Sequence, residues 1–259
     1  MTRLLLAGGG TGGHLFPAMA VGEAWRDAFG EDAELLFVGT ADRIEARVVP
    51  EAGERFEAIE VSGIVGLRGW RKILGILRLP MALIQAIGIV RRFRPDVVVG
   101  AGGFASGPTV LAAWILRVPT AILEQNAMPG VTNRILGRLV GRVFTHFAEC
   151  ESWFSTRKIR RFGNPVRAAQ VASLQEQRPV ASHHRVRLLI MGGSQGSKAL
   201  NDGVPRALAS IDSDRVDQFE VVHQCGRQGD VQAIGDDYRE AGVHAEVVEF
   251  MTDMAARYA

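Results

Sequence analysis

The same local pattern occurs twice in this chain: a short apolar run, a glycine-rich loop and a helical pattern. Arg3–Ala7 precedes Gly8–Gly13 near the start, and Val186–Met191 precedes Gly192–Gly196 much later. A buried strand that turns through glycines into a helix brings backbone amides and the positive end of the helix toward an anion. Two such openings predict two domains of this doubly wound type.

Apolar runs alternate with helical patterns over most of the chain, which predicts βαβ units and a mostly parallel sheet. Besides the two opening strands, we expect strands at Glu34–Val38, Phe56–Val61, Asp96–Val99, Thr120–Leu123, Arg142–Thr145, Phe219–His223 and Ala245–Phe250. We expect helices at Leu15–Phe29, Arg43–Pro50, Ile73–Phe93 with a possible break at Pro80, Pro108–Leu116, Val131–Val140 and Ser197–Ser210.

A polar stretch after Asn164-Pro165 marks the expected boundary between the two domains, 1–165 and 166–259. The second domain contains only three predicted strands, fewer than a complete doubly wound domain usually has, so we expect it to be incomplete.

The composition indicates a globular protein, with 47% hydrophobic residues and a formal net charge of +2. So small a charge excludes a polycation that binds nucleic acid along its whole length. The two cysteines, Cys150 and Cys225, have no CxxC spacing and favour a reducing compartment. Glycine follows Leu4–Leu6 too soon for the apolar core of a signal peptide.

The first glycine loop satisfies the spacing G-x-G-x-x-G through Gly8, Gly10 and Gly13. A nicotinamide dinucleotide site would also need an acid at the end of the second strand, where Gly39-Thr40 stands instead. This disfavours a dehydrogenase but leaves it open. His14 begins the next helix, where the helix dipole favours a neutral imidazole. It fits either a general base or a residue that caps the loop.

Two further glycine loops are candidates for binding phosphate. Gly192–Lys198 is not a Walker A motif, because Lys198 follows Ser197 and precedes Ala199, but it is a run of amides at a helix start. The loop 100–108 follows a strand, where open α/β sheets bind their ligands. Asp212-Ser213-Asp214 lies past a helix and is more typical of a solvated surface than of a metal site.

Residues 68–78 of the first domain are rich in basic and apolar side chains. Such a segment suits a helix that lies on an anionic membrane, or a core helix with an outer arginine face. Its residues are Arg68, Trp70, Arg71, Lys72, Ile73, Leu74, Leu77 and Arg78. We refer to these eight residues as the basic–apolar segment.

Five motifs together resemble the MurG-type glycosyltransferase family. They occur in the family's order and cover nearly the whole chain, which makes the resemblance specific. The motifs are Gly9–Ala18, Gly102–Pro108, Glu124–Asn126, Asn164–Arg167 and Gly192–Ser197.

The resemblance implies an α/β protein of the GT-B class, with two Rossmann-like parallel-sheet domains, the second incomplete. It implies an inverting enzyme of peptidoglycan synthesis that moves N-acetylglucosamine from UDP-N-acetylglucosamine to lipid I, the undecaprenyl-pyrophosphate-linked acceptor, and so makes lipid II. It implies no cofactor and no chelated metal. It also implies a peripheral location on the cytoplasmic side of the inner membrane, reached through the basic–apolar segment. We expect no nucleic-acid partner, because the chain has no recognised module for binding nucleic acid.

The resemblance also assigns site residues. It makes His14 the candidate catalytic base. It assigns the acceptor pyrophosphate to Gly10, Thr11, Gly12, Gly13, Gly102, Gly103, Ser106 and Gly107. It assigns the donor to Thr11, Gly12, Gly13, Asn126, Arg167, Ser194, Gln195, Phe250 and Met251.

Proteins of the family continue well past the position of Ala259, so we expect this chain to be a fragment with an impaired donor site. The alternatives are a GT-B enzyme that acts on a different glycolipid, and a non-catalytic, membrane-associated half of a split transferase.

Overall fold

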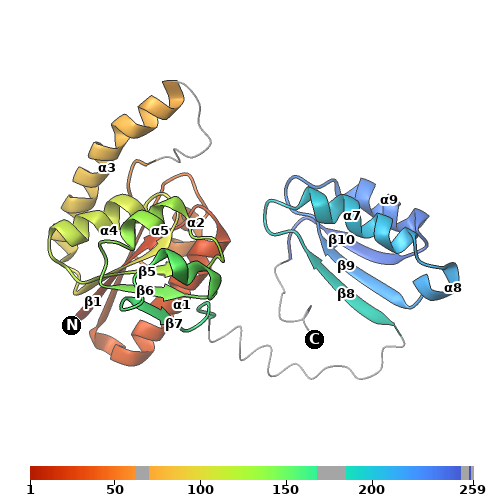
Figure 1. Cartoon of the computed structure of the whole chain (residues 1–259), viewed down its shortest axis with the longest axis horizontal. Helices are drawn as coiled ribbons and strands as arrows, with labels where there is room; N and C mark the ends of the chain where they lie inside the picture. Colours follow the sequence, from red (N-terminus) through yellow and green to blue (C-terminus); the bar gives the residue numbers. More distant parts are fainter. Residues whose placement is uncertain (62–69, 168–184, 252–256, 258–259) are drawn as a thin grey trace. The chain divides into compact units, whose positions relative to one another are not determined.

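A computed structural model describes residues 1–61, 70–167, 185–251 and 257. The chain forms two compact units, Met1–Ala168 (unit 1) and Ala169–Ala259 (unit 2), which are drawn in Figure 1. The boundary expected from the sequence lay between 165 and 166. Each unit is an α/β structure built on its own parallel sheet.

The sheet of unit 1 has seven strands in the order β3-β2-β1-β4-β5-β6-β7, all parallel. The strands are β1 (Thr2–Gly8), β2 (Ala33–Gly39), β3 (Phe56–Ala58), β4 (Val97–Gly102), β5 (Thr120–Glu124), β6 (Arg142–Thr145) and β7 (Ile159–Arg161). The order reverses between β1 and β4, and such a switch point is where ligands bind in open α/β sheets. The sequence pattern did not predict β7, a short edge strand with two arginines.

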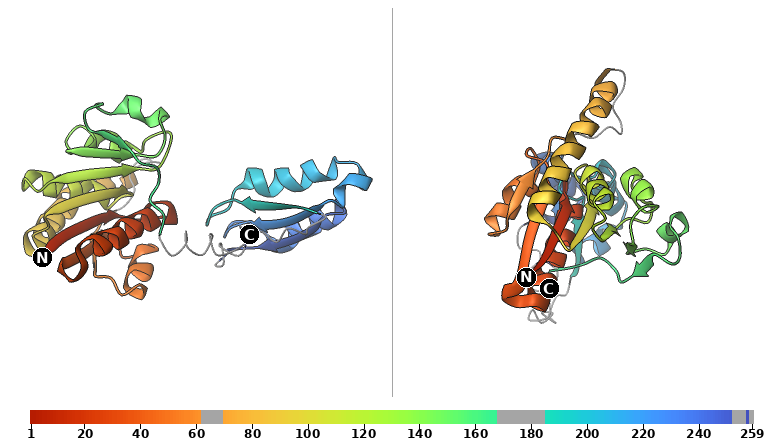
Figure 2. Two further views of the ribbon diagram at one scale, coloured as in Figure 1. Left: turned by 90° about the horizontal axis from the view of Figure 1, so that it is seen from below. Right: turned by 90° about the vertical axis from the view of Figure 1, so that its left-hand side faces the viewer.

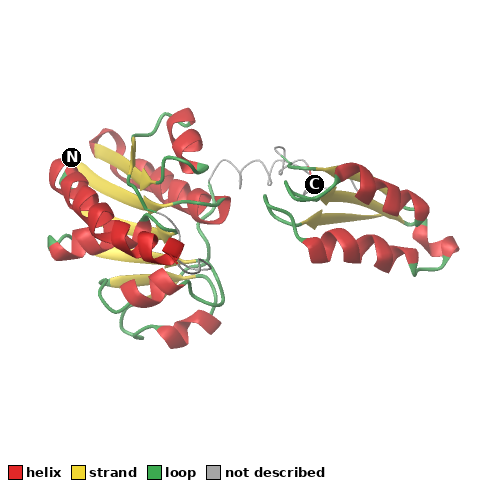
Figure 3. Ribbon diagram, turned by 90° about the horizontal axis from the view of Figure 1, so that it is seen from above, coloured by secondary structure: helices red, strands yellow, loops and turns green. Residues whose placement is uncertain are grey.

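Helices cover both faces of this sheet, because alternate strand residues point to opposite sides (Figures 2 and 3). Helices α1 (Gly12–Phe29) and α2 (Glu45–Glu51) pack on the face that carries Leu4, Leu6 and Leu35. Helices α3 (Trp70–Phe93), α4 (Ser106–Ile115) and α5 (Val131–Leu136) pack on the face of Leu5, Leu36 and Val98. Two short 3₁₀ turns, η1 (Gly30–Asp32) and η2 (Glu149–Trp153), complete the unit.

Helix α3 is continuous through Pro80, so the break that the sequence allowed does not occur. A proline inside a helix removes one backbone hydrogen bond. Packing compensates for this: Ala82, Ala86 and Val90 recur at helical spacing and are buried. The contact between α3 and α4 is among the most extensive between elements of unit 1.

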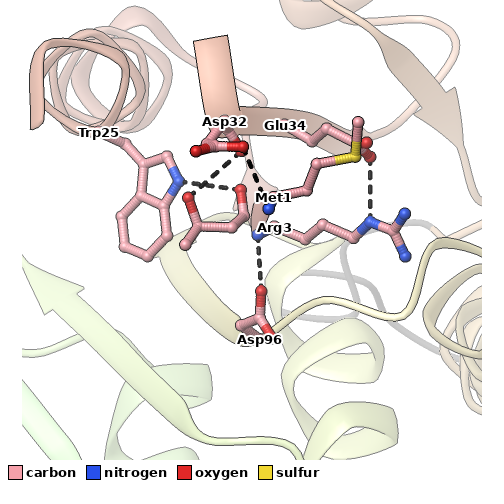
Figure 4. Close-up of polar contacts among 7 residues, drawn as sticks. Met1, Arg3, Trp25, Asp32, Glu34 and Asp96 are labelled. Carbon is pink, nitrogen blue, oxygen red and sulfur yellow. Dashed lines mark hydrogen bonds and ion pairs between the residues drawn. The ribbon is translucent and has the colours of Figure 1, made fainter. Parts of the chain in front are cut away.

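Polar contacts close the amino ends of the central strands (Figure 4). The backbone N–H of Arg3 donates to Asp96 Oδ2 at 2.8 Å, and Arg3 Nε pairs with Glu34 Oε2 at 3.0 Å. The N-terminal ammonium lies 3.3 Å from Asp32 Oδ1, and Trp25 Nε1 donates to Thr2 O at 3.4 Å. The glycine loops lie at the other end of the sheet, where the strands finish.

Unit 2 has a three-stranded parallel sheet in the order β10-β9-β8. Its strands are β8 (Val186–Met191), β9 (Phe219–Gln224) and β10 (His244–Val248), and its helices are α7 (Lys198–Ala209), α8 (Ser213–Val216) and α9 (Val231–Glu240). Helices α7 and α9 pack together on one face of the sheet (Figure 1). The sequence analysis missed α9, whose start is marked by Asp230, which caps Gln232 N and Ala233 N.

Within the described ranges, no helix combines the length and the apolar character needed to cross a membrane.

Candidate active site

Two glycine loops of unit 1 touch through their backbones at the switch point. A Cβ atom on Gly103 would lie 2.3 Å from Gly9 O, and one on Gly8 would lie 2.9 Å from Gly102 O. Gly102 and Gly103 also have φ angles of +97° and +82°, which favour glycine. The structure therefore brings together the loops 8–13 and 102–107 that the sequence analysis singled out separately.

His14 joins these two loops. A Cβ on Gly102 would lie 2.6 Å from His14 Nδ1, so the imidazole rests directly against the second loop. Nδ1 is buried and has no hydrogen-bond partner among the described residues. Because Nδ1 faces Gly102, the Nε2 edge is the part of the ring that can reach a ligand.

The start of α1 leaves amides available for an anion. Thr11 is the N-cap residue, and neither it nor any acid in the first turn caps the helix with a side chain. The amides of Gly12 and Gly13 therefore lie at the positive end of the helix dipole. The amide of Gly10 is different, because it donates to Glu45 Oε2 at 2.8 Å and is used inside the protein.

Glu45 is a site residue that sequence reasoning missed. Its carboxylate is 1% exposed and accepts two further hydrogen bonds at Oε1, from Thr40 N (3.0 Å) and Thr40 Oγ1 (2.9 Å). A Cβ on Gly9 or on Gly39 would collide with this side chain. Glu45 thus fastens the first glycine loop to the end of β2.

Glu124 plays a similar role at the end of β5. Its carboxylate, 2% exposed, accepts from the backbone N and the side-chain Nδ2 of Asn126, from Gly130 N and from Asn133 Nδ2. Asn126 is exposed, and its backbone N–H and one N–H of Nδ2 donate to Glu124 Oε1. Its Oδ1 is therefore the atom left to accept a hydrogen bond from a ligand.

Two predicted site residues, Ser106 and Arg167, are less accessible to solvent than Asn126. Ser106 is fully buried at the start of α4, where its hydroxyl rests against the Cα of Gly100. Arg167 lies in unit 1, and its Nε forms an ion pair of 2.5 Å with Glu23 of α1. Both partners are about one-third exposed, so the guanidinium is anchored beside α1 and still reaches solvent.

The basic–apolar segment is only partly described. Arg68 lies outside the described residues. Its seven other members belong to the first turns of α3, and their side chains are also outside the described part.

Unit 2 repeats the contact of two glycine loops. A Cβ on Gly226 would lie 2.0 Å from Gly196 N, and one on Gly196 would lie 2.2 Å from Cys225 O. The amides of Arg227 and Gln228 donate to Ser194 O and Gln195 O, both at 3.2 Å. The loop 192–197 after β8 and the loop 225–229 after β9 therefore form one surface at the carboxyl ends of their strands.

Gln224, 5% exposed, links this surface to the segment after β10. Its Nε2 donates to Gly193 O at 3.2 Å, and its Oε1 accepts from Met251 N at 2.9 Å. Met251 is buried, while Phe250 is 53% exposed. The predicted donor residues of unit 2 thus lie on one connected set of loops, and the sequence pattern gave no sign of Gln224.

Among the described residues, no cluster of three or more His, Cys, Asp or Glu side chains is arranged to hold a metal ion. Asp212 only precedes the short helix α8 as its N-cap residue.

Family models match both parts of the chain. The glycosyltransferase family 28 N-terminal domain matches residues 4–145, and the family 28 C-terminal domain matches 187–259. The first match alone covers more than half of the chain.

Curated relatives are similar over nearly the whole chain. The UDP-N-acetylglucosamine–N-acetylmuramyl-(pentapeptide) pyrophosphoryl-undecaprenol N-acetylglucosamine transferase of Anaeromyxobacter sp. (strain Fw109-5) is 46% identical over 99% of this chain and 66% of its own length. The transferase of the same name from Syntrophus aciditrophicus (strain SB) is 44% identical over 99% and 70%. The chain thus spans slightly less than two thirds of the Anaeromyxobacter protein.

Among solved structures, MurG of Acinetobacter baumannii aligns with a TM-score of 0.70 and 28% identity, covering 99% of this chain and 69% of that one. The GT-B class expected from the resemblance is therefore the observed fold class. The chain belongs to glycosyltransferase family 28 and, within it, to the MurG-type transferases.

Proposed function

We propose that this chain carries the acceptor-binding loops and the diphosphate-binding loops of an inverting N-acetylglucosaminyltransferase of peptidoglycan synthesis. The donor is UDP-N-acetylglucosamine and the acceptor is lipid I. The observation that supports this most is the pair of touching glycine loops at the carboxyl ends of the strands in each unit. The names of the relatives point to the same donor and acceptor.

In unit 1, the amides at the start of α1 supply donors for the acceptor pyrophosphate. Thr11, Gly12 and Gly13 lie at the positive end of a helix without a side-chain cap. Gly102, Gly103 and Gly107 form the neighbouring wall. Gly10 acts indirectly, since its amide is bound to Glu45. The side chain of Ser106 is buried against Gly100, so we place it behind this wall rather than in contact with the pyrophosphate.

In unit 2, the loop with Ser194 and Gln195 receives the diphosphate of the donor, and the segment with Phe250 and Met251 receives the uracil. Asn126 and Arg167 of unit 1 are also assigned to donor binding, as the resemblance implies. The chemical step is a single displacement. The acceptor hydroxyl oxygen forms a bond to the anomeric carbon as the bond from that carbon to the UDP oxygen breaks. UDP leaves with the electron pair, and backbone amides and Arg167 stabilise its charge.

His14 accepts the proton of the attacking hydroxyl in this scheme. Its Nε2 edge faces away from the buried Nδ1, and it lies where both glycine loops of unit 1 meet. A general base must reach the proton directly or through one water molecule, and the contact of His14 with the second glycine loop supports this role.

The basic–apolar segment at the start of α3 is proposed to bind the anionic cytoplasmic surface of the inner membrane, where a lipid-borne acceptor is found. Charge reversal of Arg71 and Lys72 is expected to abolish sedimentation with anionic vesicles. Unchanged sedimentation would remove this segment from the proposal.

A chimera tests the function without relying on the ends of this chain. Residues 1–259 replace the matching segment of the Anaeromyxobacter transferase, and transfer of labelled N-acetylglucosamine to a lipid I analogue is measured. We expect transfer, with loss of turnover but not of UDP binding in His14→Ala. Transfer only to another glycolipid would favour a different acceptor. Binding of NAD in place of UDP would refute the proposal. Vesicle binding without any transfer would favour the non-catalytic, membrane-associated half of a split transferase.

A further inference from the structure

A fully buried imidazole lies under the diphosphate-binding loops of unit 2, and the proposed reaction does not use it. His223, at the end of β9, is 0% exposed. Its Nδ1 lies 2.8 Å from Tyr238 Oη on α9, and its Nε2 lies 3.1 Å from Asn201 Oδ1 on α7. One side chain therefore connects the strand to both helices that pack on this sheet.

The hydrogen bonds of this group have one consistent direction. Asn201 Nδ2 donates to Cys225 O at 3.1 Å, which leaves Asn201 Oδ1 as an acceptor. His223 Nε2 must then carry the proton, and in the neutral imidazole Nδ1 accepts from the hydroxyl of Tyr238. The chain runs Tyr238 O–H to Nδ1, Nε2–H to Asn201 Oδ1, and Asn201 N–H to Cys225 O. Each step is satisfied only by the neutral imidazole.

The end of this chain is the backbone of the loop itself. Cys225 O lies against Gly196, where a Cβ would be only 2.2 Å away, and the next residues donate to the loop that holds Ser194. Gly229 also lies against this group, because a Cβ there would be 2.9 Å from Asn201 Nδ2. The Cys225 carbonyl thus lies at the contact between the two loops.

We propose that Tyr238, His223 and Asn201 are positioning residues that hold the Cys225 carbonyl inward and so keep the two loops of unit 2 closed around the donor diphosphate. This inference rests on the proposed function for the identity of the ligand, whereas the loop geometry stands on its own. None of the three side chains needs to touch the nucleotide. Burial lowers the pKa of His223, which agrees with the neutral form.

The first test is made on the wild-type chain without any ligand. Nitrogen NMR of the imidazole is expected to show a single neutral tautomer protonated at Nε2 across neutral pH. A tautomer protonated at Nδ1, or an imidazolium, would overturn the proposal, because neither can donate and accept in the required order.

The second test uses two isosteric variants and one control. Asn201→Asp replaces the donor to Cys225 O by an acceptor, and Tyr238→Phe removes the hydroxyl that donates to Nδ1. Asp202→Asn changes the next residue of α7, whose carboxylate is 41% exposed and pairs with Lys198. Hydrogen exchange is followed at the Arg227 and Gln228 amides, which report loop closure, and UDP affinity is measured by calorimetry.

Asn201→Asp is expected to raise exchange at both amides and weaken UDP binding by about tenfold, the scale of one buried hydrogen bond left unmade. Tyr238→Phe gives a smaller change in the same direction, and Asp202→Asn gives none. Native exchange and native affinity in both Asn201→Asp and Tyr238→Phe would refute the proposal. If the wild-type chain fails to bind UDP, the affinities are measured in the chimera. Failure of the chimera to bind UDP would refute the proposed function, while the tautomer and the exchange rates still decide this inference.

Discussion

The carboxylate of Glu45 is expected to be the main support of the first glycine loop, and Glu45→Gln tests this without changing the shape of the side chain. The wild-type carboxylate accepts three hydrogen bonds, one from Gly10 N and two from Thr40. The glutamine carbonyl can replace one of the two oxygens only. The amide group then faces a donor, either Gly10 N–H or the pair on Thr40.

The magnitude follows from these contacts. A hydrogen bond to a charged acceptor contributes about 1.5–3 kcal/mol, and a buried donor without a partner costs about 1–3 kcal/mol. Removing a buried charge offsets part of this cost. We therefore expect Glu45→Gln to lower the free energy of unfolding of unit 1 by roughly 2 kcal/mol, within the range of these bonds.

Tryptophan fluorescence during urea unfolding measures this change, because all four tryptophans of the chain lie within residues 1–168. With a urea slope of about 2 kcal/mol per molar, the midpoint shifts down by roughly 1 M. Glu51→Gln is the matched control, since Glu51 is an exposed residue of the same helix. A Glu45→Gln protein with the wild-type midpoint and unchanged exchange at the Gly10 amide would refute the reasoning.

Three other predictions concern the loops, the buried histidine and metal ions. Gly103→Ala is expected to abolish transfer by the chimera, because the new Cβ would lie 2.3 Å from Gly9 O. Gly130→Ala is the control and should retain transfer, because a Cβ there meets nothing within 4 Å. Equal activity of the two variants would show that transfer does not require the backbone contact. Burial lowers the pKa of His223, so the unfolded state binds the proton more tightly than the folded state. The free energy of unfolding of unit 2 should therefore fall as the pH drops below about 6.5, by up to about 1.4 kcal/mol per pH unit. Circular dichroism during urea unfolding measures this, and a slope that survives in His223→Gln would contradict the assignment. Transfer by the chimera should be unchanged by EDTA, and loss of transfer that Mg²⁺ restores would contradict the metal-free mechanism.

Much of the fold could be predicted from the sequence because strands buried on both faces form continuous apolar runs. Leu4, Leu5 and Leu6 are all at most 1% exposed, and this run identified β1. The strand β7 was missed because an edge strand of three residues, two of them arginines, carries no such run. Helix α9 was missed because only Ile234 and Tyr238 of its residues are buried, so its apolar stripe is narrow.

The glycine loops were visible in the sequence, whereas their supports were not. Glu45 and Gln224 resemble ordinary surface residues in sequence, since acids and amides are usually exposed. Glu124 was visible only as part of the motif Glu124–Asn126. Glu45 accepts a hydrogen bond from Gly10, and Gln224 contacts Gly193 and Met251, all in segments distant in the sequence, so no local pattern shows these contacts. The motifs therefore identified the glycine loops, but not the side chains that hold these loops in place.

An amide NMR titration of the chain with UDP tests the central claim, that the touching glycine loops of unit 2 receive the donor diphosphate. We expect saturable shifts at residues 192–197 and 225–229, with the loop 102–107 unaffected by UDP alone. Shifts confined to unit 1, or equal shifts from NAD, would contradict it.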